Sequence, residues 1–207
     1  GPFHGIRCDL TKSCLNTLTE NIVEKFGVPY CLVNNAGMGV FKDMVDMDYE
    51  TYEYLTKLNY LAPVRLTLDL LKYMVERGEG IIVNVITAGI FIHWNRLAAY
   101  IAPKVSLHYF TETLRDVVRK YGIRVIGVYP SIVKSDFFEH PTLKGLKDKI
   151  KYFGTSEDVA RAIIKAIEKG KDRVYVPSNV KLLALTSKIF KIKGELIEKM
   201  VYTEGKN

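Results

Sequence analysis

Apolar positions along the 207-residue chain follow two alternating patterns. Short runs of consecutive apolar, often β-branched residues predict strands at 30–33, 81–85, 123–129 and 173–176, and a smaller run predicts one at 3–7. Between these runs, apolar residues recur every three or four positions. That spacing predicts helices over 15–26, 48–77 and 98–121, and one from Ser156 to the stop at Gly170.

Strands that are apolar on both faces and alternate with helices predict a parallel sheet covered on both sides, a doubly wound α/β fold. Ligands of such folds bind at the carboxyl ends of the strands. We therefore expect the chemistry just after Val33, Val85 and Tyr129. Residues 1–178 are predicted to form one domain. Residues 179–207 form a basic amphipathic tail, which is expected to pack on the domain edge as a helix. Its alternatives are a substrate lid, an oligomer contact and a helix on a membrane surface.

Composition excludes several classes of protein. With 48% hydrophobic and 26% charged residues, the chain is not disordered. The net charge of +7 is dispersed among many lysines and glutamates, so we expect no nucleic-acid partner. Three cysteines without CxxC spacing predict a reduced cytoplasmic protein without a disulfide framework. The four histidines show no ligand spacing, and no metal site is predicted. Neither a signal peptide nor an apolar run of membrane-spanning length is expected.

Candidate chemistry follows the strand that ends at Val85. Thr87 comes next, and Tyr100 and Lys104 lie four residues apart in a predicted helix, which places both side chains on one face. A nearby ammonium favours a phenolate, so Lys104 is expected to lower the pKa of Tyr100 toward neutrality. Such a phenol exchanges a proton with an alcohol or carbonyl oxygen, and the Thr87 hydroxyl could hold that oxygen. The alternative is a solvated pair on a helix surface.

Together with four other segments, these residues resemble the short-chain dehydrogenase/reductase family. The matching segments are Asn34-Asn35-Ala36-Gly37 after a strand, Asn59 in the long helix, Thr87 before Tyr100-x-x-x-Lys104, the stretch 129–135, and Cys8-Asp9-Leu10. They run in family order along most of the chain. The resemblance implies a Rossmann-like fold and hydride transfer between NAD or NADP and a small-molecule carbonyl or secondary alcohol.

The resemblance also implies roles for individual residues. Tyr100 would be the general acid/base, Lys104 would lower its pKa and hold the nicotinamide ribose, Thr87 would orient the substrate oxygen, and Asn59 would connect Lys104 to a relay water. Cofactor contacts are expected from Asp9, Asn35, Ala36, Gly37, Tyr100, Lys104, Pro130, Ser131 and Val133. His93 and Trp94 are expected beside the substrate with Thr87. Asn34 is expected to bond across strands instead.

The sequence departs from the family pattern at four places, two of which, Pro103 within the Tyr–Lys spacing and Ser131 in place of glycine, affect the backbone only. Thr87 stands where the family has serine, which keeps the hydroxyl and adds a methyl group. The family's opening strand and Gly-rich phosphate-binding turn have no counterpart, so the first two strands are expected to be missing. Strand 30–33 would then be an open apolar edge, and the chain alone would bind NAD(P)H poorly.

Alternatives to a general carbonyl reductase remain open. One is a 3-oxoacyl thioester reductase whose basic patches dock an acidic carrier. Another is a non-catalytic or truncated module that keeps the fold for interaction. By resemblance, the long helices 48–77 and 98–121 would form a homodimer or homotetramer.

Overall fold

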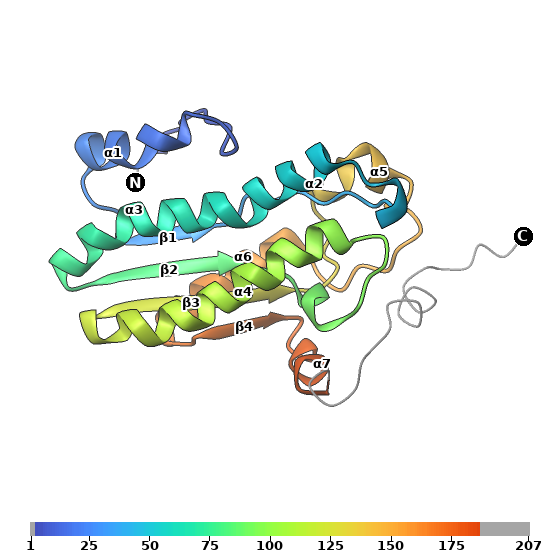
Figure 1. Ribbon diagram of the computed structural model, residues 1–207. Helices are drawn as coiled ribbons and strands as arrows, with labels where there is room; N and C mark the ends of the chain where they lie inside the picture. The colour runs from blue at the N-terminus through green and yellow to red at the C-terminus, as the bar shows by residue number, and fades with distance from the viewer. Residues whose placement is uncertain (1–2, 187–207) are drawn as a thin grey trace, which may run out of the picture.

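A computed structural model describes residues 3–186 of the chain (Figure 1). Its described strands form one parallel sheet in the order β1-β2-β3-β4. The strands are β1 (Cys31–Asn34), β2 (Gly80–Val85), β3 (Ile123–Pro130) and β4 (Arg173–Val176). In register, Val33 pairs with Val83, and Val83 pairs with Ile126. The four strands of the predicted parallel α/β sheet are confirmed, and each end lies within one residue of the prediction.

Both faces of the sheet are covered by helices. Helices α3 (Ala62–Arg77) and α4 (Ala98–Val118) lie side by side on one face, and α6 (Ser156–Glu168) covers the other (Figure 1). Successive strand residues enter opposite cores: Ile82 packs with the α3–α4 side, while Ile81 and Val83 pack with the α6 side. This double burial explains why the strands read as continuous apolar runs.

The N-terminal segment differs from the prediction. Residues 3–7 form no strand, and the Phe3 side chain is 95% exposed. Two apolar side chains without a neighbouring strand bury too little surface to hold an extended segment against the sheet. Helix α1 (Leu15–Phe26) follows, packs against α3 and ends at Gly27, whose φ of 79° favours glycine. Within residues 3–186, β1 pairs only with β2, so the expected open edge is confirmed, with Val33 45% exposed.

The prediction that no cysteines pair is wrong for Cys8 and Cys14, which form a disulfide. Between them the chain turns on itself, because the Asp9 carboxylate accepts from the Thr11 amide at 3.0 Å and the Lys12 amide donates to the Asp9 carbonyl at 2.9 Å. This turn brings together two cysteines that motif spacing alone does not link. Cys31 is free, and burial raises the pKa of its thiol.

The predicted helix 48–77 consists of three parts. Helix α2 (Tyr49–Thr56) begins at Asp48, whose carboxylate accepts from the Thr51 amide at 2.8 Å. A π-helical turn, Lys57–Leu61, then precedes α3. Pro63 is the second residue of α3, where a missing amide N–H is tolerated.

The remaining helices follow the predicted pattern with small shifts. Helix α4 continues as a 3-10 turn, Arg119–Tyr121, and ends at Gly122 with a φ of 75°. The cap of α6 is Thr155, one residue before the predicted Ser156, in a capping box with Asp158. Five short elements are also found in the described part of the chain: the 3-10 turns Met44–Asp46, Ala88–Phe91 and Asp136–Glu139, and the helices α5 (Pro141–Lys144) and α7 (Val180–Thr186).

The predicted tail is described only as far as α7, and its residues after 186 lie outside the described part of the chain. Over residues 3–186, no helix combines the length and the apolar character that a membrane crossing requires.

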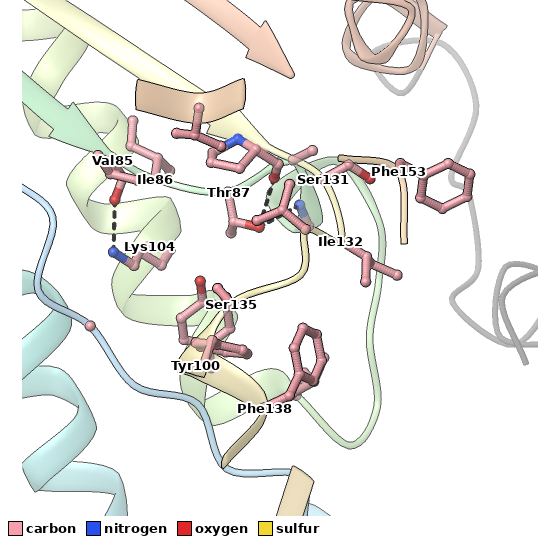
Figure 2. Close-up of a pocket in the computed structure, with 18 of the residues that line it drawn as sticks. Val85, Ile86, Thr87, Tyr100, Lys104, Ser131, Ile132, Ser135, Phe138 and Phe153 are labelled. Atoms are coloured by element: carbon pink, nitrogen blue, oxygen red, sulfur yellow. Dashed lines mark hydrogen bonds between the residues drawn. The ribbon is translucent and has the colours of Figure 1, made fainter. Parts of the chain in front are cut away.

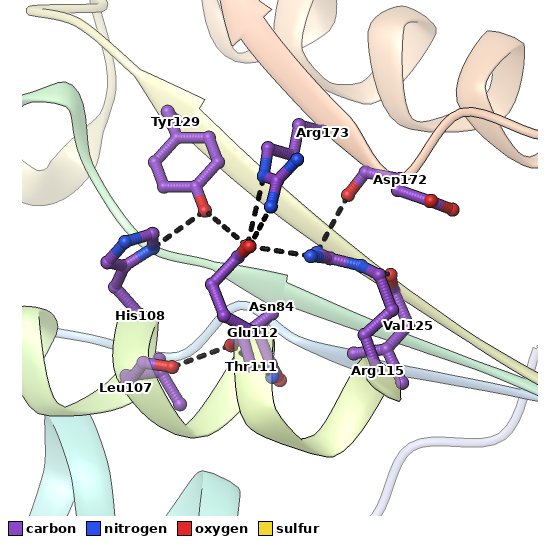
Figure 3. A network of polar contacts seen from close by, with 10 residues as sticks. All are labelled: Asn84, Leu107, His108, Thr111, Glu112, Arg115, Val125, Tyr129, Asp172 and Arg173. Carbon is purple, nitrogen blue, oxygen red and sulfur yellow. Dashed lines mark hydrogen bonds and ion pairs between the residues drawn. The ribbon is translucent and has the colours of Figure 1, made fainter. Parts of the chain in front are cut away.

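A polar network centred on Glu112 fixes α4 to β3 and β4 (Figure 3). The Glu112 carboxylate pairs with Arg115 at 2.8 Å and with Arg173, and it accepts from the Tyr129 hydroxyl at 3.4 Å. Arg115 also donates to the Val125 carbonyl at 2.9 Å. Burial opposes the charge of Glu112, yet the two guanidinium groups outweigh it and lower the pKa of the carboxyl group. The network holds the carboxyl end of β3 in place beside the site described next.

Candidate active site

A cavity of about 1060 Å³ opens at the carboxyl ends of β1, β2 and β3. Its lining includes the residues that follow each strand, the start of α4, the segment 131–153, and one side each of α6 and α7. This is the edge of the sheet at which the sequence predicts the chemistry. Thr87, Tyr100 and Lys104 all line it.

Thr87 and Tyr100 face each other in the cavity. The Thr87 side chain is near enough to the Tyr100 hydroxyl to lower the pKa of the phenol, and Figure 2 shows the phenol directed toward it. Thr87 is itself held by two main-chain contacts: its Oγ1 accepts from the Gly89 amide at 3.1 Å and donates to the Pro130 carbonyl at 3.4 Å. A hydroxyl fixed by its neighbours keeps a substrate oxygen in one position at low entropic cost.

Lys104 lies one helical turn from Tyr100 and is 3% exposed. Its Nζ donates to the Val85 carbonyl at 2.8 Å, so the ammonium is tied to the end of β2 (Figure 2). Burial lowers the pKa of Lys104 to about 8. The residue is thus a buried group of the cavity and not a member of a solvated surface pair.

The pKa of Tyr100 moves in the direction opposite to our expectation. Burial raises it above its ordinary value, and the hydrogen bond to Thr87 lowers it by less. The expected effect of the Lys104 ammonium is not among the causes of the shift. Desolvation of the phenolate therefore exceeds the opposing effect of Thr87.

Asn59 is fully buried in the π-helical turn. Its Nδ2 donates to the Met38 carbonyl at 2.9 Å and to the Leu55 carbonyl at 3.0 Å. A Cβ on Gly37 would lie 2.8 Å from Asn59 Oδ1 and 3.4 Å from Lys104 Nζ. Asn59 and Lys104 thus face the same small space beside Gly37, where any side chain would separate them.

The predicted cofactor contacts divide into two groups. Asn35, Gly37, Pro130, Ser131 and Val133 line the cavity with Tyr100 and Lys104. Ala36 is exposed and is not part of the described lining, and Asp9 is exposed in the turn that carries the disulfide.

Asn34 bonds across the strands, as expected. Its Nδ2 donates to Asn84 Oδ1 at 2.8 Å and to Thr67 Oγ1 at 3.2 Å.

Of the two residues between Thr87 and Tyr100 that were predicted to contact the substrate, one lines the cavity and the other does not. Trp94 lines the cavity, and its buried indole N–H has no hydrogen-bond partner among the described residues. His93 is exposed and does not belong to the described lining.

Sequence reasoning missed the apolar wall of the cavity. The wall is built from an irregular segment after β3 and from α6 and α7, and includes Phe137, Phe138, Leu143, Leu146, Ile150, Phe153, Ile163 and Leu183. Phe137 packs on the Tyr100 ring with centroids 5.1 Å apart. The available signal was the recurrence of apolar residues in 137–153, a stretch without a regular period.

Within residues 3–186, no three side chains of His, Cys, Asp or Glu lie close enough together to hold a metal ion.

Comparison with known proteins adds independent information. Residues 1–144 match the family described as short chain dehydrogenase. A fatty acyl-CoA reductase from Acinetobacter baylyi is 31% identical over 173 residues, which are 81% of this chain and 56% of that protein. An agropine synthesis reductase from Rhizobium rhizogenes is 32% identical over 75% of this chain and 35% of its own length. The chain thus spans about half or less of the length of these relatives.

Solved structures show the same fold. A short-chain dehydrogenase from Streptomyces avermitilis superposes with a TM-score of 0.77 at 26% identity, covering 94% of this chain and 77% of that one. A 4-hydroxyisoleucine dehydrogenase in complex with NADH superposes with a TM-score of 0.71 at 20% identity, covering 83% of this chain and 78% of that one.

Proposed function

The chain belongs to the short-chain dehydrogenase family, and from that premise we propose that it catalyses NAD(P)-dependent hydride transfer between the cofactor and a carbonyl or secondary alcohol. The observation that carries the proposal is the placement of Thr87 beside Tyr100, with Lys104 buried one helical turn away in the same cavity. Proton transfer to a carbonyl oxygen needs a donor and a positioning group close to each other.

The residues at the strand ends fit a nicotinamide cofactor. Gly37 exposes its backbone at the mouth of the cavity, and Asn35, Pro130, Ser131 and Val133 border the same opening. These residues would hold the nicotinamide half of NAD or NADP, which when bound supplies or accepts the hydride. The solved relatives that contain NADH or NADP support this choice of cofactor by their fold.

In the proposed reaction Tyr100 handles the proton. Because its pKa is raised, the phenol is protonated at neutral pH and can donate its proton to the oxygen of a carbonyl group that is being reduced. Thr87 would hold that oxygen beside the phenol. Lys104 would favour the phenolate that remains, and its own pKa of about 8 allows it to pass on a proton near neutrality.

The test is a variant series in the full-length protein. Tyr100→Phe should lower the rate of NAD(P)H oxidation with a carbonyl substrate by about 10²–10⁴-fold, the usual contribution of a general acid. Cofactor affinity, measured by nicotinamide fluorescence, should stay within about twofold. Thr87→Ser should retain most of the activity and Thr87→Ala should lose it. Wild-type rates in Tyr100→Phe would refute the assignment.

A thioester substrate is the second candidate. The relative from Acinetobacter baylyi is a fatty acyl-CoA reductase, and the apolar wall of the cavity suits an acyl chain. A 3-oxoacyl thioester and the matching simple ketone should then differ in kcat/KM. If no carbonyl compound is reduced, the chain is the non-catalytic interaction module that the sequence also allows.

We also propose a homodimer or homotetramer that associates through the long helices. Their outer face carries exposed apolar side chains, which include Leu61, Leu68, Val105, Tyr109 and Val117. Tyr109, at 75% exposure, is the most open of the five. Tyr109→Glu should lower the mass measured by light scattering to that of the monomer, and an unchanged mass would place the interface elsewhere.

The predicted cytoplasmic location stays a prediction. It was based on unpaired cysteines, whereas a disulfide such as Cys8–Cys14 is more common in oxidising compartments. Cell fractionation, combined with thiol labelling of Cys8 and Cys14, would decide between these compartments.

A further inference from the structure

The cavity is large and mostly apolar. Its volume of about 1060 Å³ lies just above the range of about 300–1000 Å³ that is usual for small-molecule sites, and it includes the residues proposed above to hold the nicotinamide half of the cofactor. The part beyond Tyr100 is bordered by apolar side chains from two parts of the chain. One is the irregular segment with Phe138, Leu146 and Phe153, and the other is formed by α6 and α7 with Ile163 and Leu183.

Charge is nearly absent from this part of the lining. Among the described residues that border the cavity, the titratable groups outside the catalytic set are Asp136 and His140. Asp136 is exposed, and His140 Nδ1 contacts Thr142 Oγ1 at 2.9 Å. Lys104 is a buried cation at the other end. A charged substrate tail would lose its hydration here and would find few groups of opposite charge.

The apolar part of the cavity extends from Thr87 in the direction away from Lys104. Figure 2 shows Ile132, Phe138 and Phe153 on the side of Thr87 that is turned away from Lys104. The Phe153 ring is 39% exposed, so a ligand that covers it removes aromatic surface from water. A substrate whose oxygen meets Tyr100 and Thr87 would therefore extend its remaining part along this wall.

We propose that the substrate is a carbonyl compound or alcohol with a long, unbranched alkyl tail, bound along the wall formed by segment 137–153 and by α6 and α7. The position of its oxygen beside Tyr100 rests on the proposed function, whereas the binding of the tail does not. Burial of each added methylene should tighten binding about fourfold, which corresponds to ~0.8 kcal/mol, until the chain fills the wall.

The experiment measures binding without turnover. Straight-chain methyl ketones of about six to fourteen carbons displace a fluorescent probe that carries a dodecyl chain from the purified full-length protein. Wild type should show the fourfold increments and then a plateau. Ile163→Trp fills the wall from α6, so its plateau should come several carbons earlier while the shortest ketones bind as before.

Ile164→Trp is the matched control. The residue is next to Ile163 on the same helix, is 56% exposed and does not line the cavity, so the variant should behave as wild type. Melting temperatures show whether both variants fold. If Ile163→Trp does not fold, Phe153→Ala at the exposed rim takes its place, and it should weaken only the longest ketones.

The outcomes separate this inference from the proposed function. An affinity independent of chain length, or the same plateau in Ile163→Trp and Ile164→Trp, overturns the inference even if short ketones are reduced. Tighter binding of bulky branched ketones overturns it as well. Regular increments in wild type and in Tyr100→Phe, with no turnover of any ketone, support the inference and count against the proposed function.

Discussion

Replacing Lys104 by methionine should make the protein more stable at neutral pH and less stable at alkaline pH. Lys104 is 3% exposed, and burial lowers its pKa from 10.5 to about 8. Between these two values the unfolded chain binds the proton more strongly than the folded protein. The free energy of unfolding therefore rises with pH through this window.

The magnitude follows from the size of the shift. A difference of roughly 2.5 pKa units corresponds to ~3 kcal/mol, and this cost is fully present below pH ~8 and absent above pH ~10.5. Methionine removes the cost but leaves the Val85 carbonyl without its 2.8 Å donor, a loss of ~1–2 kcal/mol at any pH. Lys104→Met should thus gain ~1–2 kcal/mol at neutral pH and lose about the same at pH ~10.5.

Urea unfolding, followed by the fluorescence of the single tryptophan, Trp94, measures both values. Lys165→Met is the control, because Lys165 is exposed on α6 and its removal should change stability by less than ~0.5 kcal/mol at either pH. If Lys104→Met changes the free energy of unfolding in the same direction at both pH values, the reasoning is refuted. That result would show that the charge on Lys104 does not destabilise the folded protein.

Three further results are expected. Gly39→Ala places a Cβ 2.4 Å from the Phe137 ring, which must shift from its present contact with Tyr100, so the free energy of unfolding should fall by ~1–3 kcal/mol and KM should rise. A Cβ added at Gly145 has no other atom within 4 Å, and the φ of −67° at this residue is one that alanine adopts readily, so Gly145→Ala should stabilise the protein by ~0.4–1 kcal/mol. Urea unfolding measures the stability of both variants. Because the pKa of Tyr100 is raised, carbonyl reduction should persist through neutral pH, while alcohol oxidation should increase with pH. A pH–rate profile in both directions tests this, and an oxidation rate that falls with pH would contradict it.

Patterns that depend on local burial could be predicted from the sequence. Residues 81–85 and 123–129 are apolar on both faces because helices cover both sides of the sheet. An uninterrupted run of apolar residues in the sequence therefore indicates a strand that is buried on both faces. The grouping of Thr87, Tyr100 and Lys104 was also predictable. Tyr100 and Lys104 lie one turn apart on α4, and Thr87 follows β2 at the same edge of the sheet, where a doubly wound fold gathers its ligand-binding residues.

Properties that depend on distant parts of the chain could not be predicted. The sign of the Tyr100 shift is decided by how completely the surrounding protein desolvates the phenol, which residue spacing does not reveal. The apolar wall comes from segment 137–153, where no helical or strand period marks the residues that face inward. The Cys8–Cys14 pair depends on a turn stabilised by Asp9, and residues 3–7 needed a partner strand that the described chain does not provide.

The π-helical turn at Lys57–Leu61 constrains the length of its segment. Such a turn holds one residue more than an α-helical turn. Loss of a single residue inside it would restore a regular helix and leave α2 and α3 on their present faces, so Leu55 would stay in the core. Asn59 lies within the turn and would lose its place beside Gly37. The extra residue of this turn therefore serves the site, whereas a residue lost from α2 itself would rotate the residues before it by about 100° and expose Leu55.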